Sequence, residues 1–476
     1  MYDVVIIGAG ISGSILAHDL SKYQLKVAVL DKENDVANHA TGANSAMIHS
    51  GHDPKPGTLK ERFNIEGNRM YPALCKELQV AYKEIGAIVV AVNEEESQIL
   101  DQLEKQTKDR GILYKRLNQQ EVREKEPNIQ DQVIDGLFLP TTGIITPWEV
   151  TIAAMEEAID NGVSLFLNHE VTHIEAKDDH YVVTANNQSF ETKVIINAAG
   201  VYADHISEML HPSSYHIKAR KGEYYVLSKP LHPIVNHIIY PVPSSKGKGV
   251  LVVPTIHENV LLGPNSEFCE DKEASETTKD LDYVRQEVGK TVKNIPIQTM
   301  IRNFAGLRPT GDTGDFVVED DTTYPGFIHV SCIESPGLTS APAISKYVIE
   351  TLLADKLDFK KKENYQKRRA PIIMKQLSLE KQNELIKENP KYGRMICRCE
   401  KISEGEIIDV IHRSNGATTV DGVKKRCRPG MGACQGGFCE NEIVKILARE
   451  LNKNIDEIEY KAKDSYVITS KAKEGL

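Results

Sequence analysis

The sequence predicts an α/β protein with a nucleotide-binding unit at its N-terminus and a small helical, cysteine-rich domain at its C-terminus. Two observations predict this organisation: a strand–glycine–helix–strand order opens the chain, and five of its eight cysteines lie between residues 397 and 439. At 476 residues the chain is longer than one hydrophobic core usually serves, so two or three domains are expected. The formal net charge of −10 argues against nucleic acid as a partner, because such proteins concentrate positive charge.

The N-terminal segment has the features of a Rossmann-type unit. An apolar, β-branched run at residues 4–7 predicts a buried parallel strand, and GAGISG follows at residues 8–13. Gly8 permits the tight turn, Gly10 lets backbone amides approach a diphosphate, and Gly13 lets the helix pack on the strand. A second strand at residues 26–30 ends at Asp31, whose carboxylate can accept hydrogen bonds from ribose hydroxyls. This order predicts a dinucleotide site. Its position favours FAD over NAD, although composition alone does not separate the two.

Two later segments fit the same unit. Residues 193–197 form a further apolar strand that runs into Ala198, Ala199 and Gly200. Residues 334–342, ESPGLTSAP, precede an apolar helix, and proline is well tolerated near a helix start. Backbone amides around Gly337 to Ser340 could point at a flavin ring and stabilise negative charge on its reduced form. A plain loop-to-helix connection is the alternative interpretation.

Several stretches resemble the glycine-oxidase/D-amino-acid-oxidase-like flavoenzymes. They lie at residues 43–51, 221–225, 247–250, 263–265, 304–308 and 334–338. Within this family the chain is most similar to FAD-dependent glycerol-3-phosphate dehydrogenases and oxidases, and L-2-hydroxyglutarate dehydrogenases share many of the same stretches. The resemblance spans residues 1–355. It implies an FAD domain built from pieces near 1–75, 145–200 and 300–355, with the intervening segments forming a mostly antiparallel sheet that roofs the flavin and supplies the substrate pocket.

The resemblance also implies the residues of the site. For the cofactor these are Gly8, Gly10, Ser12, Gly13, Asp31, Lys32, Asn44, Ser45, Val171, Gly200, Gly337, Leu338 and Thr339. Oxidation of an alcohol on a flavin needs a base for the hydroxyl proton, and a histidine suits this role because its usual pKa of about 6.5 is near working pH. His49 is the expected base and His52 its local competitor. Arg308 and Lys248 could hold an anionic group, and Ser335 could donate a hydrogen bond.

A charged linker at residues 356–394 is expected to precede the C-terminal domain at residues 395–460, with a short tail at 461–476. The cysteines of this domain form the pattern CxC, thirty-four residues, CxxxxC. Four thiolates on two loops suit zinc or a [2Fe–2S] cluster, and the tight CxC favours iron. The stretch resembles the bacterioferritin-associated-ferredoxin-like [2Fe–2S] module. That resemblance implies Cys397, Cys399, Cys434 and Cys439 as ligands and leaves Cys427 outside the pattern.

A cluster beside a flavin predicts a dehydrogenase that passes electrons one at a time to a protein partner or a quinone. The expected reaction is oxidation of sn-glycerol 3-phosphate to dihydroxyacetone phosphate. The alternatives are L-2-hydroxyglutarate or a related 2-hydroxy acid as substrate, an electron-transfer subunit without a substrate of its own, and a zinc-stabilised flavoprotein. No apolar run is long enough to cross a bilayer and the N-terminus lacks the features of a secretory signal, so a cytoplasmic location is expected, with membrane contact through a partner left open.

Overall fold

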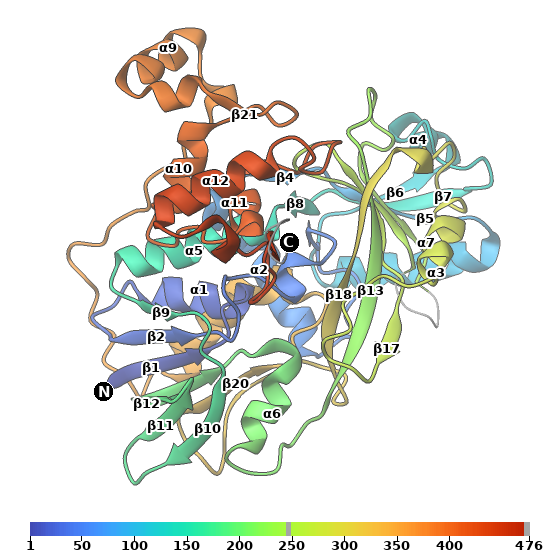
Figure 1. Cartoon of the computed structure of the whole chain (residues 1–476). Helices are drawn as coiled ribbons and strands as arrows, with labels where there is room; N and C mark the ends of the chain where they lie inside the picture. Colours follow the sequence, from blue (N-terminus) through green and yellow to red (C-terminus); the bar gives the residue numbers. More distant parts are fainter. Residues whose placement is uncertain (244–248, 471–476) are drawn as a thin grey trace.

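The structure is a computed structural model that describes residues 1–243 and 249–470. It has two large sheets, a small third sheet and a helical C-terminal domain (Figure 1). The expected α/β fold is confirmed: a Rossmann-type unit and a largely antiparallel second sheet lie side by side. None of the helices in the described part of the chain is both long and apolar enough to cross a membrane.

The first sheet is the nucleotide-binding unit. Its central strands are parallel, because the register pairs Val4 with Val194 on one side and with Val27 on the other. In order along the sheet the strands are β10 (Val171–Ala176), β11 (Tyr181–Ala185), β12 (Gln188–Asn197), β1 (Tyr2–Ile7), β2 (Val27–Leu30) and β9 (Ser164–Phe166), with β20 (Phe327–Ser331) on β12 and β19 (Val317–Asp320) on β20. The apolar runs at β1 and β2 are buried on both faces, as expected of parallel strands.

Helices cover both faces of this sheet. On one face α1 (Ile11–Leu20) packs against α5 (Pro147–Asp160) and α8 (Gly337–Tyr347), and α8 also packs against α2 (Leu59–Glu77). On the other face α6 (Ala203–Glu208) contacts β12 and β20. The approach of α2 to α8 requires Gly67, because a Cβ there would lie 2.0 Å from the carbonyl oxygen of Thr339.

The second sheet has nine strands and is mostly antiparallel. Its order is β17 (Glu267–Cys269), β13 (Ile217–Leu227), β16 (Val260–Gly263), β15 (Leu251–Pro254), β14 (Ile238–Pro241), β5 (Ala87–Ala91), β7 (Asp135–Leu139) and β6 (Lys115–Asn118), with β18 (Met300–Gly311) on β13. The helices α3 (Glu94–Asp109), α4 (Gln119–Lys125) and α7 (Leu281–Val288) pack on it. The pairing of β18 with β13 places residues 300–311 in this sheet, and the expected division of the chain into FAD pieces stays a prediction.

A small sheet connects the two large ones. It consists of β3 (Met47–Ile48), β8 (Gly143–Ile145) and β4 (Tyr82–Glu84). β3 follows the loop that leaves β2 and pairs with β8. This pairing fixes the position of the chain from Met47 to His49.

The C-terminal domain has its own apolar core. It contains the hairpin β21 (Met395–Cys397) and β22 (Ile402–Ser403) and the helices α10 (Glu404–Ile411), α11 (Val420–Cys427) and α12 (Glu440–Leu451). Ser403 and Glu406 form a reciprocal capping box at the start of α10. In Figure 1 the domain lies over α1 and α5, whereas α9 (Leu379–Glu388) in the preceding segment stands apart from the body of the molecule.

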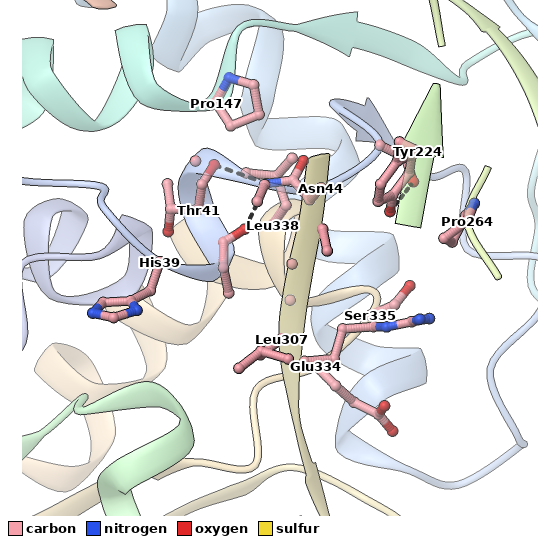
Figure 2. Close-up of a pocket in the computed structure, with 18 of the residues that line it drawn as sticks. His39, Thr41, Asn44, Pro147, Tyr224, Pro264, Leu307, Glu334, Ser335 and Leu338 are labelled. Carbon is pink, nitrogen blue, oxygen red and sulfur yellow. Dashed lines mark hydrogen bonds between the residues drawn. The ribbon is translucent and has the colours of Figure 1, made fainter. Parts of the chain in front are cut away.

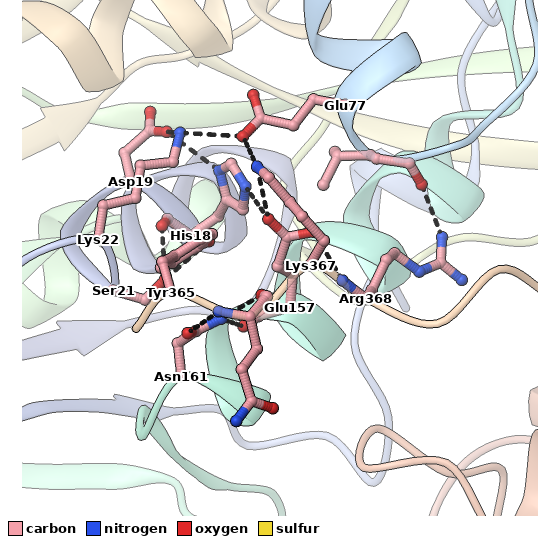
Figure 3. Close-up of polar contacts among 12 residues, drawn as sticks. His18, Asp19, Ser21, Lys22, Glu77, Glu157, Asn161, Tyr365, Lys367 and Arg368 are labelled. Carbon is pink, nitrogen blue, oxygen red and sulfur yellow. Dashed lines mark hydrogen bonds and ion pairs between the residues drawn. The ribbon is translucent and has the colours of Figure 1, made fainter. Parts of the chain in front are cut away.

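The segment before α9 is held to the FAD unit by polar contacts (Figure 3). His18 of α1 lies between Asp19 and Glu157, at 3.0 and 3.4 Å. Lys367 pairs with Glu157 at 3.3 Å, and the backbone N–H of Arg368 donates to the same carboxylate at 3.1 Å. The grouping of His18, Glu157 and Glu77 could suggest a metal site, but the ammonium groups of Lys22 and Lys367 already neutralise these carboxylates. We therefore interpret this network as structural.

Candidate active site and cysteine cluster

A cavity of about 2450 Å³ lies where the two large sheets and the C-terminal domain meet. Its wall includes the N-terminus of α1, the loop that follows β2, strands of the second sheet and the N-terminus of α8. Figure 2 shows this arrangement: Thr41 and Asn44 come from the loop, Tyr224 and Pro264 from the second sheet, and Ser335 and Leu338 from the α8 region. This volume exceeds the few hundred to one thousand Å³ of an ordinary ligand pocket, so it suits a dinucleotide together with a substrate.

The glycines at the N-terminus of α1 are packed too closely for side chains. Gly8 has φ +106°, and a Cβ there would lie 2.4 Å from the carbonyl oxygen of Ala198. A Cβ on Gly13 would lie 1.9 Å from the carbonyl oxygen of Gly8. Gly10 and Ser12 line the cavity, and the hydroxyl of Thr41 accepts the N–H of Ile11 at 3.0 Å. The helix N-terminus therefore faces the cavity with little steric cover, which fits a bound diphosphate.

The residues expected around the adenosine lie on one wall. The carboxylate of Asp31 accepts the N–H groups of Ala9 at 2.6 Å and Glu33 at 2.9 Å, and burial raises the pKa of this carboxyl. Lys32 pairs with Glu273 at 2.6 Å and lies over the ring of Tyr202. Val171 and Gly200 line the same wall. The structure thus brings these residues together, and their contacts with the cofactor stay predictions.

The loop after β2 is shaped by its own side chains. Asn44 donates to the carbonyls of Ala40 and Thr41, at 3.0 and 2.9 Å, and accepts the N–H of Ala46 at 2.8 Å. The hydroxyl of Ser45 lies 3.0 Å from that of Tyr224. The Asn44 side chain is therefore a brace for the loop, and its backbone and Ser45 are the groups that the loop offers to a ligand.

The N-terminus of α8 contacts the predicted base. Thr339 is fully buried, and its hydroxyl accepts the N–H of His49 at 2.9 Å. Gly337 and Leu338 line the cavity, and Ser335 lines it immediately before the helix (Figure 2). Because helix N-termini favour negative charge, this end of the cavity suits an electron-rich ring.

His49 is 8% exposed and lines the cavity. Its Nδ1 lies 3.1 Å from the hydroxyl of Tyr240, and its carbonyl accepts from Asn64 at 2.8 Å. Its competitor His52 is buried beside Ser50, with Nδ1 3.1 Å from the hydroxyl. The imidazole of His49 is thus held in place at the cavity, which suits a general base.

Two arginines lie directly opposite each other on β13 and β18. The register pairs Arg220 with Arg308, so both side chains leave the same face of the sheet. Arg308 donates to the carbonyls of Arg220, Lys221 and Asn265 at 3.1, 2.9 and 2.8 Å, and burial lowers its pKa. Like charges in this position destabilise a sheet. Both arginines line the cavity, so an anionic group placed there would meet two guanidinium groups.

Carboxylate Glu334 organises the charges around this pair. It accepts from Lys60 and Thr310 at 2.8 Å each and also pairs with Arg220. Burial acts to raise the pKa of Glu334, but the charges of Lys60 and Arg220 hold it below its usual value. Sequence reasoning missed Arg220 and Lys60, although Arg220 immediately precedes the stretch at 221–225. The predicted second cation, Lys248, lies outside the described residues.

The four predicted cluster ligands approach in two pairs. The sulfurs of Cys399 and Cys434 are 3.7 Å apart. A hydrogen bond from Cys439, aided by the N–H groups of Gly430 and Glu400, lowers the pKa of Cys397 to about 6. Gly432 is required beside them, because a Cβ there would lie 2.3 Å from the Cβ of Cys399. Four cysteine sulfurs brought together in two close pairs fit a [2Fe–2S] cluster.

The fifth cysteine of the domain is separate. Cys427 packs against the apolar core, donates weakly to the carbonyl of Val423 at 3.5 Å, and has its pKa raised by burial. Its expected exclusion from the ligand set stays a prediction.

Ion pairs hold the C-terminal domain against the FAD unit. Arg426 forms a two-pronged contact with Asp35 at 2.7 and 2.8 Å, and Arg413 contacts Glu156 at 2.5 Å. The cavity continues to this interface, where Met431 and Gln435 line it between the flavin unit and the cysteine loop.

Comparison with protein families matches residues 3–351 to the FAD dependent oxidoreductase family and residues 395–449 to the BFD-like [2Fe-2S] binding domain. The chain is 47% identical to glycerol 3-phosphate dehydrogenase from Caloramator mitchellensis over 99% of both chains. It is 31% identical to L-2-hydroxyglutarate dehydrogenase from Escherichia coli, covering 74% of this chain and 94% of the relative.

Among solved structures, dithionite-reduced L-α-glycerophosphate oxidase from Mycoplasma pneumoniae with FAD bound superposes with a TM-score of 0.73 at 32% identity. The match covers 78% of this chain and 99% of the oxidase. The cofactors FAD and [2Fe–2S] predicted from the sequence are confirmed by these matches. The chain belongs to the FAD dependent oxidoreductase family and carries a BFD-like [2Fe–2S] binding domain.

Proposed function

We propose that this enzyme oxidises sn-glycerol 3-phosphate to dihydroxyacetone phosphate and passes the electrons through its [2Fe–2S] cluster to a partner protein or a quinone. The observation that carries the proposal is the cross-strand pair Arg220 and Arg308, which lines the same cavity as His49. A phosphate monoester is close to doubly charged at neutral pH, and two guanidinium groups match it in charge and geometry. The 47% identity to a glycerol 3-phosphate dehydrogenase supports the same substrate.

The residues divide the chemistry between them. When bound, FAD supplies a two-electron hydride acceptor and the cluster a one-electron carrier. Arg308 and Arg220 hold the phosphate, and so orient the C2 carbinol of the substrate. His49 takes the proton of the C2 hydroxyl while the C2 hydrogen leaves as hydride. The hydroxyl of Tyr240 contacts Nδ1 of the His49 imidazole, and the hydroxyl of Thr339 accepts the backbone N–H of the same residue. Together these contacts fix the position of the base. With FAD bound, the hydroxyl proton would rest on His49 and the hydride would go to the cofactor, so the ketone product leaves protons and electrons balanced.

A dehydrogenase is favoured over an oxidase by the C-terminal domain. The glycerophosphate oxidase aligns over 99% of its own chain but over only 78% of this one. In this chain the match to the FAD dependent oxidoreductase family ends at residue 351. A cluster domain at residues 395–449 gives electrons a route that does not require dioxygen.

Anaerobic reduction of the purified holoenzyme tests the substrate. Glycerol 3-phosphate should bleach the flavin absorption and then give the electron paramagnetic resonance signal of a reduced [2Fe–2S] cluster. The variant Arg308→Gln tests the phosphate contact. It should need a much higher substrate concentration for the same bleaching, because a charge-assisted contact to the phosphate is lost. Bleaching by L-2-hydroxyglutarate alone would overturn the substrate, and bleaching by neither compound would favour an electron-transfer subunit.

L-2-Hydroxyglutarate is the second candidate. The relative from Escherichia coli supports it, and the arginine pair would also bind a carboxylate. Glycerol 3-phosphate is preferred because the dehydrogenase that carries this name is similar over the full chain, including the cluster domain.

A further inference from the structure

Helix α11 of the C-terminal domain brings positive charge to the wall of the main cavity. The basic run at residues 424–428 places three cations there, Lys424, Lys425 and Arg428. Lys461 from the C-terminal tail and Arg302 from β18 line the same region. The proposed substrate contacts do not use any of these residues.

Lys424 differs from its neighbours in having no partner. Lys425 donates to Asn38 and lies 3.6 Å from Asp421, and Arg428 donates to Glu400 at 3.2 Å. Lys424 is only 7% exposed, yet within residues 1–243 and 249–470 it has no hydrogen bond and no ion pair for its ammonium group. Burial, together with the charge of Arg302, lowers its pKa to about 8, although the carboxylates of Asp421 and Glu440 act in the opposite direction. The ammonium group therefore faces the cavity from a mostly buried side chain, and this position favours an anion that the cavity can supply.

The position of Lys424 is separate from the arginine pair. Arg302 and Arg308 are six residues apart on β18, and a strand rises about 3.3 Å per residue, so roughly 20 Å separates them. The adjacent Lys425 contacts Asn38, which lies in the loop that brings Thr41 to the N-terminus of α1. The cations of α11 therefore face the part of the cavity nearest the expected diphosphate.

We propose that Lys424, with Arg302 and Lys461 at the rim, binds a phosphate group inside the cavity, so that the C-terminal domain completes a ligand site of the FAD unit. The group is either the diphosphate of FAD or the phosphate of a free ester that enters from this side. A lysine suits both, because its ammonium acts as a compact point charge with three donors. This assignment does not depend on which substrate the enzyme oxidises.

The variant Lys424→Met in the full-length protein tests the proposal. Its control is Lys445→Met on α12 of the same domain, because Lys445 is 52% exposed and pairs with Glu442 on the surface. Two affinities are measured at low salt: that of the apoprotein for FAD, by quenching of flavin fluorescence, and that of the holoenzyme for inorganic phosphate, by perturbation of the flavin spectrum. Iron content and circular dichroism establish that each variant is folded.

The two sources of phosphate give different results. If the ligand is FAD, Lys424→Met should weaken FAD binding about tenfold or more and the control should not. If the ligand is a free phosphate ester, FAD affinity should stay unchanged and the holoenzyme should lose one of two phosphate sites, keeping only the binding at Arg220 and Arg308. Wild-type affinity for both would overturn the proposal. Lys424→Arg keeps the charge and should bind within about threefold of wild type, and Lys424→Gln, which also removes the charge, replaces the methionine variant if that one fails to fold.

Thermal unfolding separates ligand binding from a structural role. Removal of an unpartnered buried cation should leave the FAD-free protein as stable as wild type or more stable, while FAD should raise its unfolding temperature less than it raises that of wild type. A loss of stability in the FAD-free variant, with an unchanged shift on adding FAD, would mean that Lys424 is merely structural.

Discussion

The Asp35–Arg426 pair should control the docking of the C-terminal domain, and Asp35→Asn tests it. The two contacts are 2.7 and 2.8 Å long, and the side chains are 7% and 3% exposed. Asparagine keeps the shape of the side chain but removes its charge, which leaves the guanidinium buried beside a neutral group. Loss of one partner of a buried pair costs about 3–5 kcal/mol. Since 1.4 kcal/mol is a factor of ten, the undocked fraction should rise by roughly two to three and a half orders of magnitude.

Two measurements follow this change. Hydrogen exchange at α11 and at the loop around residue 38 should become faster, because both segments open with the interface. Rapid-mixing experiments should show the flavin reduced by substrate at the wild-type rate, followed by slower reduction of the cluster. The matched control is Glu442→Gln, which breaks a surface pair with Arg394 and should change stability by less than about 1 kcal/mol.

The same pair predicts a pH dependence. Burial acts to raise the pKa of Asp35, but the charge and hydrogen bonds of Arg426 hold it below the usual 3.8. Its stabilisation is therefore complete above about pH 4 and is lost as the pH falls through the lower, folded-state pKa. In the Asp35→Asn variant the docking free energy should therefore depend less on pH below about pH 4 than it does in wild type. The reasoning would be refuted if Asp35→Asn and Arg426→Met were additive in the double variant, because residues that interact directly show coupling of 0.5 kcal/mol or more.

Three further predictions concern the cofactors and the base. Gly13→Ala should abolish FAD retention and lower the unfolding temperature, because the new Cβ would lie 1.9 Å from the carbonyl oxygen of Gly8; a yellow, stable variant would contradict this packing. Cys434→Ala should remove the visible absorption and acid-labile sulfide of the cluster, whereas Cys427→Ala should keep both, and equal loss in the two variants would refute the ligand set. His49→Asn should lower kcat by about 10²–10⁴-fold with an unchanged flavin spectrum, and near wild-type turnover would exclude it as the base.

Local signals in the sequence were sufficient for the nucleotide-binding turn. The order of strand, glycines, helix and acid is contiguous, so Gly8, Gly13 and Asp31 could be placed before any tertiary contact was known. The cysteine pattern is similar in kind, since two short loops carry all four sulfurs. Both features are carried by short contiguous stretches, residues 8–13 for the turn and the CxC and CxxxxC stretches for the cluster.

The arginine pair could not be found in this way. Arg220 and Arg308 meet only through the register of β13 with β18, which joins segments 88 residues apart. The same pairing places residues 300–311 in the second sheet, which local sequence could not indicate because a strand's partner is set by long-range packing. Helix α11 was also missed. Thr419 caps it at the N–H of Gly422, but its mostly polar sequence masks the apolar face at Val420 and Val423.

The end of α11 shows why docking and ligand binding belong together. Successive residues of an α-helix are rotated by about 100°, so three consecutive basic residues point in three directions. Arg426 reaches Asp35, Lys425 reaches Asn38, and Lys424 lines the cavity. One turn of helix therefore fixes the C-terminal domain to the loop after β2. The same turn sets the position of the Lys424 ammonium group at the cavity. If Lys424 binds phosphate, Asp35→Asn must also weaken that binding, although it removes no group that contacts the ligand. A docking defect with undiminished affinity of the Asp35→Asn variant for both FAD and phosphate would show that the two roles of this helix are independent.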